Sequence, residues 1–502
     1  MCVMHRLRAN AALVAICISY FAVVLVLICN RAPSWDEGWF ASPAYNLAHH
    51  GHFGTTTIDP QGYLLRPELT HINQRTYWVL PFSLLLQIPW YAVFGFGLVQ
   101  MRLMTALFGA LAIIALHRWT LRLTGSHLSA SVAALLMAQD NLLLLRSADG
   151  RMDVMCLSLG LMGQAAYLAL RERSVAKALL AANTLLCLAF LTHPNAVIPL
   201  LTLTATVVVL DASRLRPAHI MSVAIPYLIG GAALAAWALP DPAGFTAQLM
   251  GNKAADRMNL LRHPLDAVLE DVARYKYVYI GAQYAPGKFA PIKAVLLITW
   301  FGGYLGQTLV GGLKQRSAVV LALCGAIPVL VLTFFNVKNS YYLIYIVPFF
   351  AANAGCLFDH LWRRGVASRR FAAAALSITL LVSGAVTGRR VLTGRDGLVE
   401  YQRLAARANS LLPVGQRMIA PASWAFGVGF DRVVQDDNLG FYSRLCPAVI
   451  IDSGLAADEI ENLRKGAPAV LQYRNQMLTT YYKAVDNGLY QRISCPAGTH
   501  AD

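Results

Sequence analysis

The sequence contains a series of apolar runs, and their length constrains the fold more than any other feature. An α-helix needs about 20 consecutive apolar residues to cross the hydrocarbon of a bilayer, and many of these runs reach that length. Only 14% of the 502 residues are charged, whereas soluble globular proteins have about 25%. The sequence therefore predicts an all-α polytopic membrane protein.

Short basic clusters separate the apolar runs, and these clusters account for the net charge of +16. Lys and Arg are enriched at the cytoplasmic ends of membrane spans, so this distribution predicts topology and argues against nucleic-acid binding. The first run has a basic start but no small-x-small cleavage site, which indicates a retained span with a cytoplasmic N-terminus. We place about eleven spans, at residues 10–29, 98–117, 128–146, 154–170, 178–193, 195–210, 219–238, 291–312, 317–335, 341–358 and 371–387.

One further apolar run, residues 77–95, does not fit this threading as a span. If it crossed the membrane, every later basic cluster would move to the outside. Pro81 and Pro89 also interrupt it, and proline breaks the hydrogen bonding of a helix interior. We predict a pair of short helices at the outer membrane surface, the alternative being a true span with an irregular topology.

The threading divides the chain into two predicted domains. Residues 1–388 are predicted to form a transmembrane domain whose first outer loop is 30–97, and residues 389–502 to form a small extracytoplasmic α/β domain. The strand-like runs of this tail include "PAVIIDSG" and "PAVLQY". Cys446 and Cys495 lie in the tail, where an oxidising compartment would allow a disulfide, and the sequence leaves that pairing open.

Acidic residues collect at the predicted outer ends of the spans. Asp36 and Glu37 follow the first span, and Asp153 opens a later one. Such acids can act as a general base or orient a hydroxyl. The alternative is structural, because an Asp at the start of a helix can cap its backbone N–H groups.

Three further polar side chains lie at the same predicted face. Lys338 and Tyr342 belong to "NVKNSYY", where a cation could hold a phosphate. The alternative is a lipid-headgroup anchor with interfacial tyrosines. His193 turns between two spans, where it is either a phosphate ligand or part of a structural turn with Pro194. The sequence contains no HExxH, P-loop or GxSxG motif with supporting context, so these motifs of soluble enzymes do not help to assign a function.

The order of these segments resembles the GT-C glycosyltransferases that use polyprenyl-phosphate sugars. The resemblance rests on the outward "DE" with its aromatic-rich helix and "HHG", a surface segment ending in "FG", the run "RLMTALFGALAIIAL", and an acid that opens the next span. It covers roughly residues 10–390. It is closest to the bacterial aminoarabinose transferases, the protein O-mannosyltransferases and the transferases of lipopolysaccharide cores.

The resemblance implies roles for the acids. Asp36 corresponds to the catalytic base, Glu37 completes the pair, and Asp153 corresponds to the acid of the later span. The sequence departs from the family at Leu80, where close relatives have Lys, so that the nearest cation is Arg75. It departs again at His193–Pro194, where aminoarabinose transferases have Lys-Gly, and both departures put an aminoarabinose donor in doubt.

We therefore expect a glycosyltransferase of the bacterial cytoplasmic membrane, with its active site on the outer face. It would move a sugar from a polyprenyl-phosphate donor to a hydroxyl of lipid A, a polysaccharide, a glycolipid or a protein, by single displacement with inversion. Asp36 would activate the acceptor. Lys338, Arg75 or His193, with Tyr342 beside them, would meet the leaving phosphate.

Two other functions and one cofactor question stay open at this point. A transporter or flippase of lipid-linked sugars is the main alternative, although the acids lie on one face and no internal repeat is present. A membrane-anchored scaffold is the third reading. No cofactor is required by the sequence, and a divalent metal near Asp36 and Asp153 is left open.

Overall fold

The computed structural model describes most of the chain. The described residues are 2–58, 67–251, 263–280, 290–312, 315–335, 338–436, 439–440, 443–455 and 457–500. They divide into two compact units. The first unit comprises Met1–Ile28, Arg102–Trp237 and Ala255–Thr393, and the second comprises Cys29–Met101, Ala238–Ala254 and Gly394–Asp502. The division into domains 1–388 and 389–502 remains a prediction.

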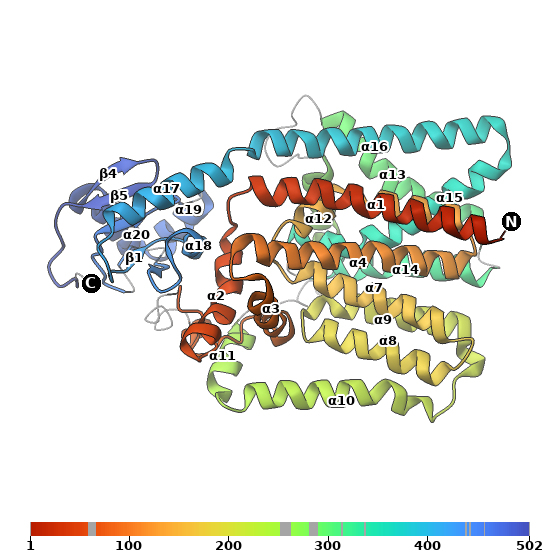
Figure 1. Cartoon of the computed structure of the whole chain (residues 1–502), viewed down its shortest axis with the longest axis horizontal. Helices are drawn as coiled ribbons and strands as arrows, with labels where there is room; N and C mark the ends of the chain where they lie inside the picture. The colour runs from red at the N-terminus through yellow and green to blue at the C-terminus, as the bar shows by residue number, and fades with distance from the viewer. Residues whose placement is uncertain are drawn as a thin grey trace. The chain divides into compact units, whose positions relative to one another are not determined.

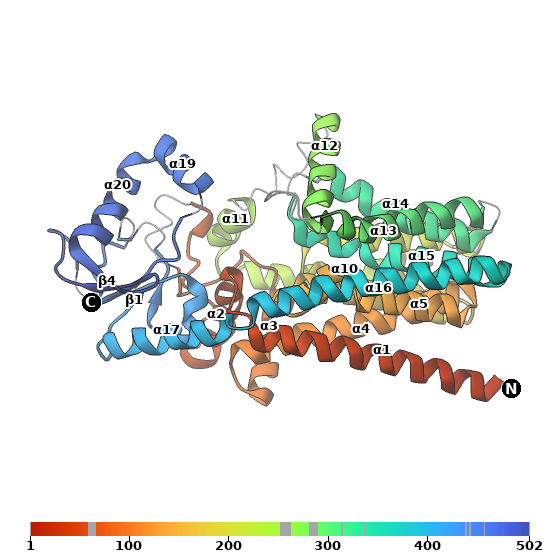
Figure 2. The same cartoon turned by 90° about the horizontal axis from the view of Figure 1, so that it is seen from above.

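Long helices build the first unit, and most of them run along one common direction, with α12 crossing them (Figures 1 and 2). They are α1 (Cys2–Asn30), α4 (Leu98–Thr124), α5 (His127–Ala138), α6 (Asn141–Ser147), α7 (Asp153–Leu170), α8 (Val175–Phe190), α9 (Val197–Asp211), α10 (His219–Ala238), α12 (Pro264–Tyr275), α13 (Ala290–Gly311), α14 (Arg316–Thr333), α15 (Val347–Arg364) and α16 (Val366–Gly394). Short 3-10 helices η3 (Pro194–Ala196), η4 (Ala212–Arg214) and η7 (Ser340–Tyr345) connect some of them.

These helices confirm the predicted class of a multi-pass membrane protein. Nine helical segments of the described chain are long and apolar enough to cross a membrane, and α5 with α6, bent by 61°, would make a tenth. The remaining predicted span, 178–193, is α8, a shorter apolar helix of 16 residues. Each of the eleven predicted spans thus coincides with helix.

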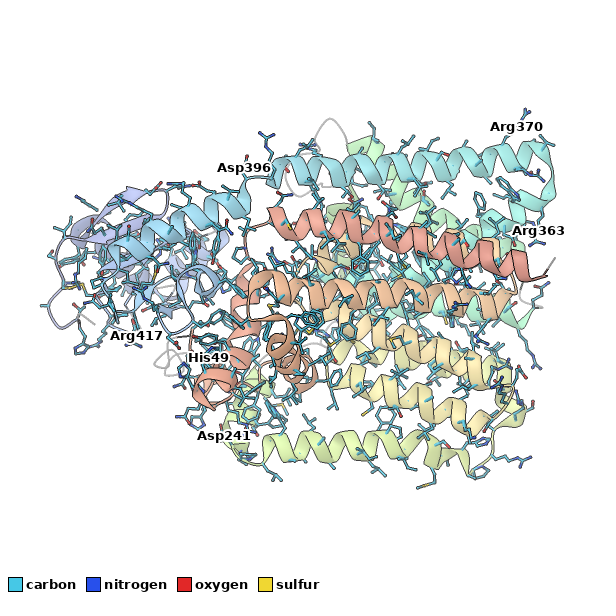
Figure 3. The ribbon with its side chains drawn as sticks, in the orientation of Figure 1. His49, Asp241, Arg363, Arg370, Asp396 and Arg417 are labelled. Atoms are coloured by element: carbon cyan, nitrogen blue, oxygen red, sulfur yellow. A yellow bond between two sulfur atoms is a disulfide. The ribbon has the colours of Figure 1, made fainter. Side chains whose placement is uncertain are left out.

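Close helix packing in this unit depends on glycines, which have no side chain. A Cβ on Gly160 of α7 would lie 2.5 Å from the Cβ of Pro199 in α9. A Cβ on Gly355 of α15 would lie 2.5 Å from the carbonyl oxygen of Ser129 in α5. Small residues let membrane helices approach closely, where lipid offers no hydrophobic force to drive them together. Charged side chains instead gather at helix ends, as Arg363 and Arg370 do at one end of the bundle (Figure 3).

The second unit joins the first outer loop to the C-terminal segment. The loop contributes α2 (Trp35–His50), η2 (Pro67–Leu69) and α3 (Pro81–Phe94), and α11 (Pro242–Gly251) comes from the third loop. The predicted pair of helices within 77–95 is wrong, because α3 is one helix of 14 residues. Pro81 begins it, where a missing N–H has no consequence, and the helix continues through Pro89.

The C-terminal segment of this unit is a small α/β structure, as expected. Its helices are α17 (Gly397–Leu411), η8 (Ala422–Trp424), α18 (Ala425–Val428), α19 (Ala457–Gly466) and α20 (Pro468–Gln476), and its strands are β1 (Met418–Ile419), β2 (Val433–Val434), β3 (Val449–Ile451), β4 (Tyr482–Asp486) and β5 (Leu489–Arg492). The sheet order is β2-β1-β3-β5-β4, with β1 parallel to β2 and β3 and the other pairs antiparallel.

Two sequence-level questions about the tail are settled by this structure. The run "PAVLQY", predicted as a strand, is the helix α20, which Pro468 opens at its first position. Cys446 and Cys495 form a disulfide, and Cys446 is buried in the core beside Ile450 and Tyr482. The pairing that the sequence left open is therefore made.

Candidate functional site

Asp153 is the first residue of α7, and its side chain is fully buried. The Nε of Arg151 donates a hydrogen bond of 2.9 Å to the Oδ2 of Asp153, and Arg151 is only 7% exposed. The other oxygen, Oδ1, lies 3.7 Å from the Nε2 of His193 and accepts no hydrogen bond from the residues that the structure describes. Asp153 thus binds the Arg151 guanidinium through Oδ2, and its other buried oxygen, Oδ1, can still accept a hydrogen bond.

Arg151 stays charged in this buried position. Burial disfavours its charge, but the Asp153 carboxylate outweighs that effect and raises the pKa of the guanidinium. The alternative of Asp153 as a helix cap is not what the structure shows, because Met152 occupies the N-cap of α7. Arg151 and Asp153 form an ion pair at the start of a long apolar helix. Charged groups in such positions are energetically costly and usually functional.

Two guanidinium groups lie over the ring of Tyr341 beside this ion pair. The Cζ of Arg146 is 3.9 Å from the ring centroid, and that of Arg151 is 4.8 Å from it. Arg146 also forms an ion pair of 2.7 Å with Asp149, which is 1% exposed. Contact with an aromatic face stabilises a guanidinium and fixes its plane. The segment "RSADGRMD" therefore supplies two Arg–Asp pairs, Arg146 with Asp149 and Arg151 with Asp153.

His193 meets Asp153 with a defined ring nitrogen. Its Nδ1 accepts a hydrogen bond of 3.1 Å from the backbone N–H of Asn195, as the N-cap of η3. In the neutral ring the hydrogen is then on Nε2, the atom that faces Asp153. The ring packs edge-on against Tyr342, with centroids 5.4 Å apart. The structure thus brings Asp153, His193 and Tyr342 together. His193 is also the N-cap of η3, so both predicted roles, in a structural turn and beside the acid, are compatible with its position.

Lys338 lies in a second charged cluster of the same unit. Its Nζ is 3.9 Å from the Oδ1 of Asp271 and donates to the carbonyl oxygens of Leu332 and Thr333. Burial lowers the pKa of Lys338, although Asp271 opposes that shift. Lys338 therefore belongs with Asp271 of α12.

Arg274 of α12 completes this cluster, and the sequence analysis missed it. It pairs with Asp271 one turn earlier, and its side chain is only 3% exposed. Its Nε and Nη1 are buried without hydrogen-bond partners among the described residues, and burial lowers its pKa. The i,i+3 Asp–Arg spacing in "EDVARY" was the available signal. A buried guanidinium with spare donors is suited to a phosphate or a carboxylate.

In the second unit, Asp36 and Glu37 lie in the first turn of α2. The N-cap is Ser34, so the alternative that Asp36 caps this helix is wrong. Glu37 takes that structural role instead: its Oε2 accepts a hydrogen bond of 2.6 Å from the N–H of Ser34, and its side chain is fully buried. Burial and the nearby Glu37 carboxylate raise the pKa of the Tyr91 hydroxyl. Asp36 is half-buried.

The C-terminal segment fixes the position of α2 within this unit. A Cβ on Gly38 would lie 2.2 Å from the carbonyl oxygen of Ala422, so the backbones are in direct contact there. The Nε1 of Trp39 donates to the Oε1 of Gln435. Tyr45 donates a hydrogen bond of 2.9 Å to the carboxylate of Asp431. The helix that carries Asp36 is therefore held by residues about 400 positions later in the chain.

Arg75 lies in the same unit as Asp36, on a loop that α11 supports. Its carbonyl oxygen accepts a hydrogen bond of 2.9 Å from Gln248, which is completely buried. Its guanidinium is 5.9 Å from the centroid of the Tyr77 ring. The predicted site residues are therefore distributed over both units: Asp36, Glu37 and Arg75 in the second, and Asp153, His193, Lys338 and Tyr342 in the first.

A metal centre needs several ligand side chains close together. In the described part of the chain, no three His, Cys, Asp or Glu side chains come together as metal ligands would.

No protein-family model matches the sequence, and no curated protein matches it by sequence. Among solved structures, the chain is similar to ArnT from Cupriavidus metallidurans bound to undecaprenyl phosphate, with 13% identity, a TM-score of 0.63 and coverage of 97% of this chain and 99% of that chain. It is also similar to the oligosaccharyltransferase AglB from Archaeoglobus fulgidus in complex with an inhibitory peptide and a dolichol-phosphate, with 13% identity, a TM-score of 0.55 and coverage of 94% and 69%. The chain therefore has the fold of the GT-C membrane glycosyltransferases, as its sequence predicted.

Proposed function

We propose that the chain is an integral membrane glycosyltransferase that moves a sugar from a polyprenyl-phosphate donor to a hydroxyl acceptor. The observation that carries this proposal is the fold, shared along nearly the whole chain with a protein that binds undecaprenyl phosphate. AglB, of the same fold, was solved with a dolichol-phosphate. A lipid-linked donor also explains why the protein is built from membrane-spanning helices, since a polyprenyl tail partitions into the bilayer.

The donor phosphate is the group that buried cations would recognise. Arg274 has two buried nitrogen atoms without partners in the described chain, and Lys338 shares its carboxylate, Asp271. A guanidinium binds phosphate oxygens through parallel N–H donors, and a nearby ammonium adds charge. We assign the donor phosphate to this cluster first, with His193, Tyr342 and Arg75 as further candidates. A cation there would stabilise the negative charge that develops on the leaving phosphate.

Asp36 is the better candidate of the first acidic pair for the general base. Glu37 already accepts the Ser34 N–H and is fully buried, so its carboxylate is committed to the helix start. Asp36 is one residue earlier and half-buried. In the proposed reaction the acceptor oxygen attacks the anomeric carbon, Asp36 takes the acceptor proton, and the bond from carbon to the phosphate oxygen breaks. A single displacement of this kind inverts the anomeric carbon, by analogy with the inverting glycosidases.

Asp153 would act on the donor through its two contacts. It orients Arg151 by the hydrogen bond to Oδ2 and faces the Nε2 of His193 with Oδ1. Because Oδ1 accepts no hydrogen bond from the described residues, it can accept one from a sugar hydroxyl. A hydroxyl held there would fix the ring of the donor sugar relative to the leaving phosphate.

The predicted orientation places the second unit outside the cytoplasm. The Cys446–Cys495 disulfide supports this, because disulfides persist in oxidising compartments and are rare in the cytosol. We therefore propose that transfer takes place at the outer face of the bacterial cytoplasmic membrane, onto an acceptor of the cell envelope.

The test is mass spectrometry of the lipids that the detergent-purified Asp36→Asn protein retains after it has been offered a panel of polyprenyl-phosphate sugars. A blocked transferase should keep its donor, whose mass identifies the sugar class. The matched control is Asp396→Asn, which changes an acid that is 81% exposed. Retention of phospholipid alone would contradict the proposal. Translocation of a lipid-linked sugar in liposomes, unaffected by Asp36→Asn, would point to the transporter alternative.

A further inference from the structure

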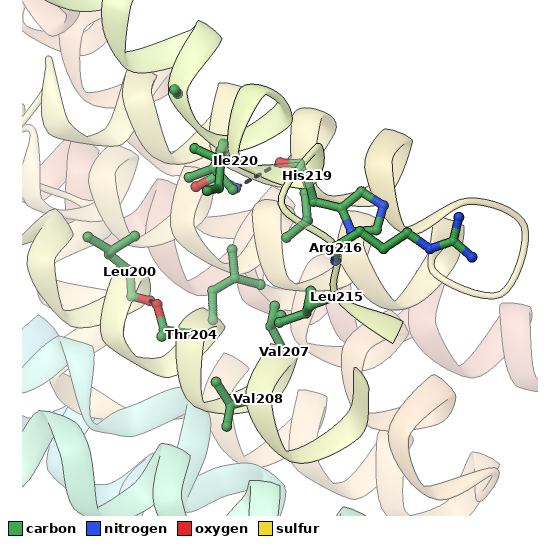
Figure 4. A pocket seen from close by; sticks show the side chains of 13 residues that line it. Leu200, Thr204, Val207, Val208, Leu215, Arg216, His219 and Ile220 are labelled. Atoms are coloured by element: carbon green, nitrogen blue, oxygen red, sulfur yellow. Dashed lines mark hydrogen bonds between the residues drawn. The ribbon is translucent and has the colours of Figure 1, made fainter. Parts of the chain in front are cut away.

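An apolar groove lies in the first unit, where α8, α9 and α10 meet. It has a volume of about 430 Å³. Its apolar wall includes Leu200, Leu203, Val207 and Val208 of α9, and Figure 4 shows Arg216 and His219 at one end of it, beyond these side chains. This end of the groove is the end of the span opposite to Asp153, because α9 finishes there and α10 begins. The groove is therefore separate from the charged clusters described above.

The two uncharged polar side chains of the groove wall, Thr204 and Asn183, are hydrogen-bonded within the helices. Thr204 donates its hydroxyl to the carbonyl oxygen of Leu200 in its own helix, at 2.9 Å. The Nδ2 of Asn183 donates to Leu179, at 2.8 Å, and its Oδ1 accepts a hydrogen bond of 3.1 Å from Tyr227. A groove whose polar atoms are satisfied internally is suited to hydrocarbon.

The cations at this end of the helices differ in how they are used. Arg171 and Arg214 are both bound to the carboxylate of Asp211, through hydrogen bonds of 2.6 to 2.9 Å. The guanidinium of Arg216 has no ion-pair or hydrogen-bond partner among the described residues, and its side chain is exposed. A positive charge without a partner among the described residues therefore lies at the open end of the apolar groove.

His219 adds a directed hydrogen-bond donor beside this charge. Its Nδ1 accepts a hydrogen bond of 3.1 Å from the backbone N–H of Arg216, so the hydrogen of the neutral ring is on Nε2. A guanidinium and an imidazole N–H side by side recognise a phosphate oxygen better than a neutral headgroup.

We propose that this groove binds one anionic glycerophospholipid, with an acyl chain along α9 and its phosphate on Arg216 and His219. The stretch of α9 from Leu200 to Val208 spans roughly 12 Å of helix, which is close to the hydrocarbon depth of one leaflet, about 15 Å. The predicted topology places Arg216 at the cytoplasmic surface, where anionic lipids gather. The site does not depend on the sugar-transfer proposal, since it uses none of the residues assigned to that reaction.

Native mass spectrometry of the full-length, detergent-purified chain tests the proposal. The protein is titrated with phosphatidylglycerol and with phosphatidylcholine of identical acyl chains. We expect one saturable phosphatidylglycerol adduct, and a loss of affinity of about fivefold in Arg216→Gln, the effect of one cation on an anionic lipid. Phosphatidylcholine binding should change little in that variant. Ala224→Trp fills the groove from α10 and should remove both adducts.

The matched control is Arg370→Gln, which removes an exposed cation from the first turn of α16. It should leave phosphatidylglycerol affinity unchanged. Equal affinity for the two lipids, or equal losses in Arg216→Gln and Arg370→Gln, would overturn the proposal. The proposal would also be overturned if the lipid displaced by Ala224→Trp were a polyprenyl phosphate.

Discussion

Two Asp–Arg networks lie at the two ends of α7, and they differ in how completely their carboxylates are used. At the end of the helix, both oxygens of Asp211 are filled, by Tyr167, by two nitrogen atoms of Arg171 and by Arg214, at 2.6 to 2.9 Å. At its start, Asp153 accepts one hydrogen bond from Arg151 on Oδ2 and none on Oδ1 from the described residues. The same residue types thus make a closed network and an open one.

This difference separates a structural ion pair from a functional candidate. Burial alone does not, because both Asp153 and Asp211 are 0% exposed. A carboxylate whose acceptor sites are all filled has nothing left for a ligand, whereas a partly filled one can accept a substrate hydroxyl. The comparison therefore predicts that the same Asp→Asn substitution lowers sugar transfer at position 153 and leaves it unchanged at position 211.

The largest effect is expected from Asp153→Asn. Asn keeps an oxygen for Arg151 but loses the charge that holds the guanidinium and faces His193. We expect sugar transfer per folded molecule to fall about 100-fold or more, the size of a lost electrostatic contact in an active site. We also expect a stability loss of about 3 kcal/mol, because the buried guanidinium of Arg151 loses its carboxylate. Transfer rates on a polyprenyl-phosphate donor, measured with the unfolding temperature of the same preparation, check this. Wild-type activity in the variant would remove the distinction between the two networks.

A loss of stability without a loss of transfer is expected from Asp211→Asn. Arg171 and Arg214 would lose their carboxylate partner. Because Arg214 is 38% exposed, water can solvate its guanidinium, so the loss of stability is smaller than for a fully buried pair. We expect a decrease of about 2 kcal/mol in stability, with transfer per folded molecule unchanged. Thermal unfolding in detergent measures the first quantity, and assays normalised to folded protein measure the second. A catalytic defect without destabilisation would show that the filled network also serves the reaction.

A smaller effect is expected from Tyr341→Ala, which sharpens the description of the open network. The ring lies against the guanidinium groups of both Arg146 and Arg151, and such contacts contribute about 1 kcal/mol. Transfer should fall about fivefold, as 1 kcal/mol predicts. Tyr341→Phe keeps the ring and serves as the matched control. Equal losses in both variants would assign the effect to the hydroxyl.

The smallest effect is expected from Glu37→Gln, and it extends the comparison to the second unit. Gln retains an oxygen for the Ser34 N–H, so we expect a stability loss of at most about 1 kcal/mol, typical of a helix-start contact. Transfer should stay within about threefold of wild type, whereas Asp36→Asn should lower it by a factor of 10² to 10⁴, the contribution of a general base. A larger loss in Glu37→Gln than in Asp36→Asn would reverse the roles of the two acids.

The sequence was sufficient for the helices and for the position of Asp153, because long apolar runs and basic clusters are local signals. It was not sufficient where tertiary contacts decide. Nothing local distinguishes "PAVLQY" as helix, and the roles of Asp36 and Glu37 follow from Ser34, whose capping position depends on where α2 begins. Arg274 was missed because its importance lies in burial without enough partners, and a sequence does not display burial.

The contact between Gly38 and the backbone of Ala422 has a consequence for how this protein can evolve. The glycine follows the acidic pair directly, and any side chain there would displace the C-terminal segment. The helix bearing Asp36 and a segment nearly 400 residues later must therefore change together, despite lying far apart in the sequence. A chimera that exchanges the tail between relatives will keep α2 in place only if the first outer loop is exchanged with it.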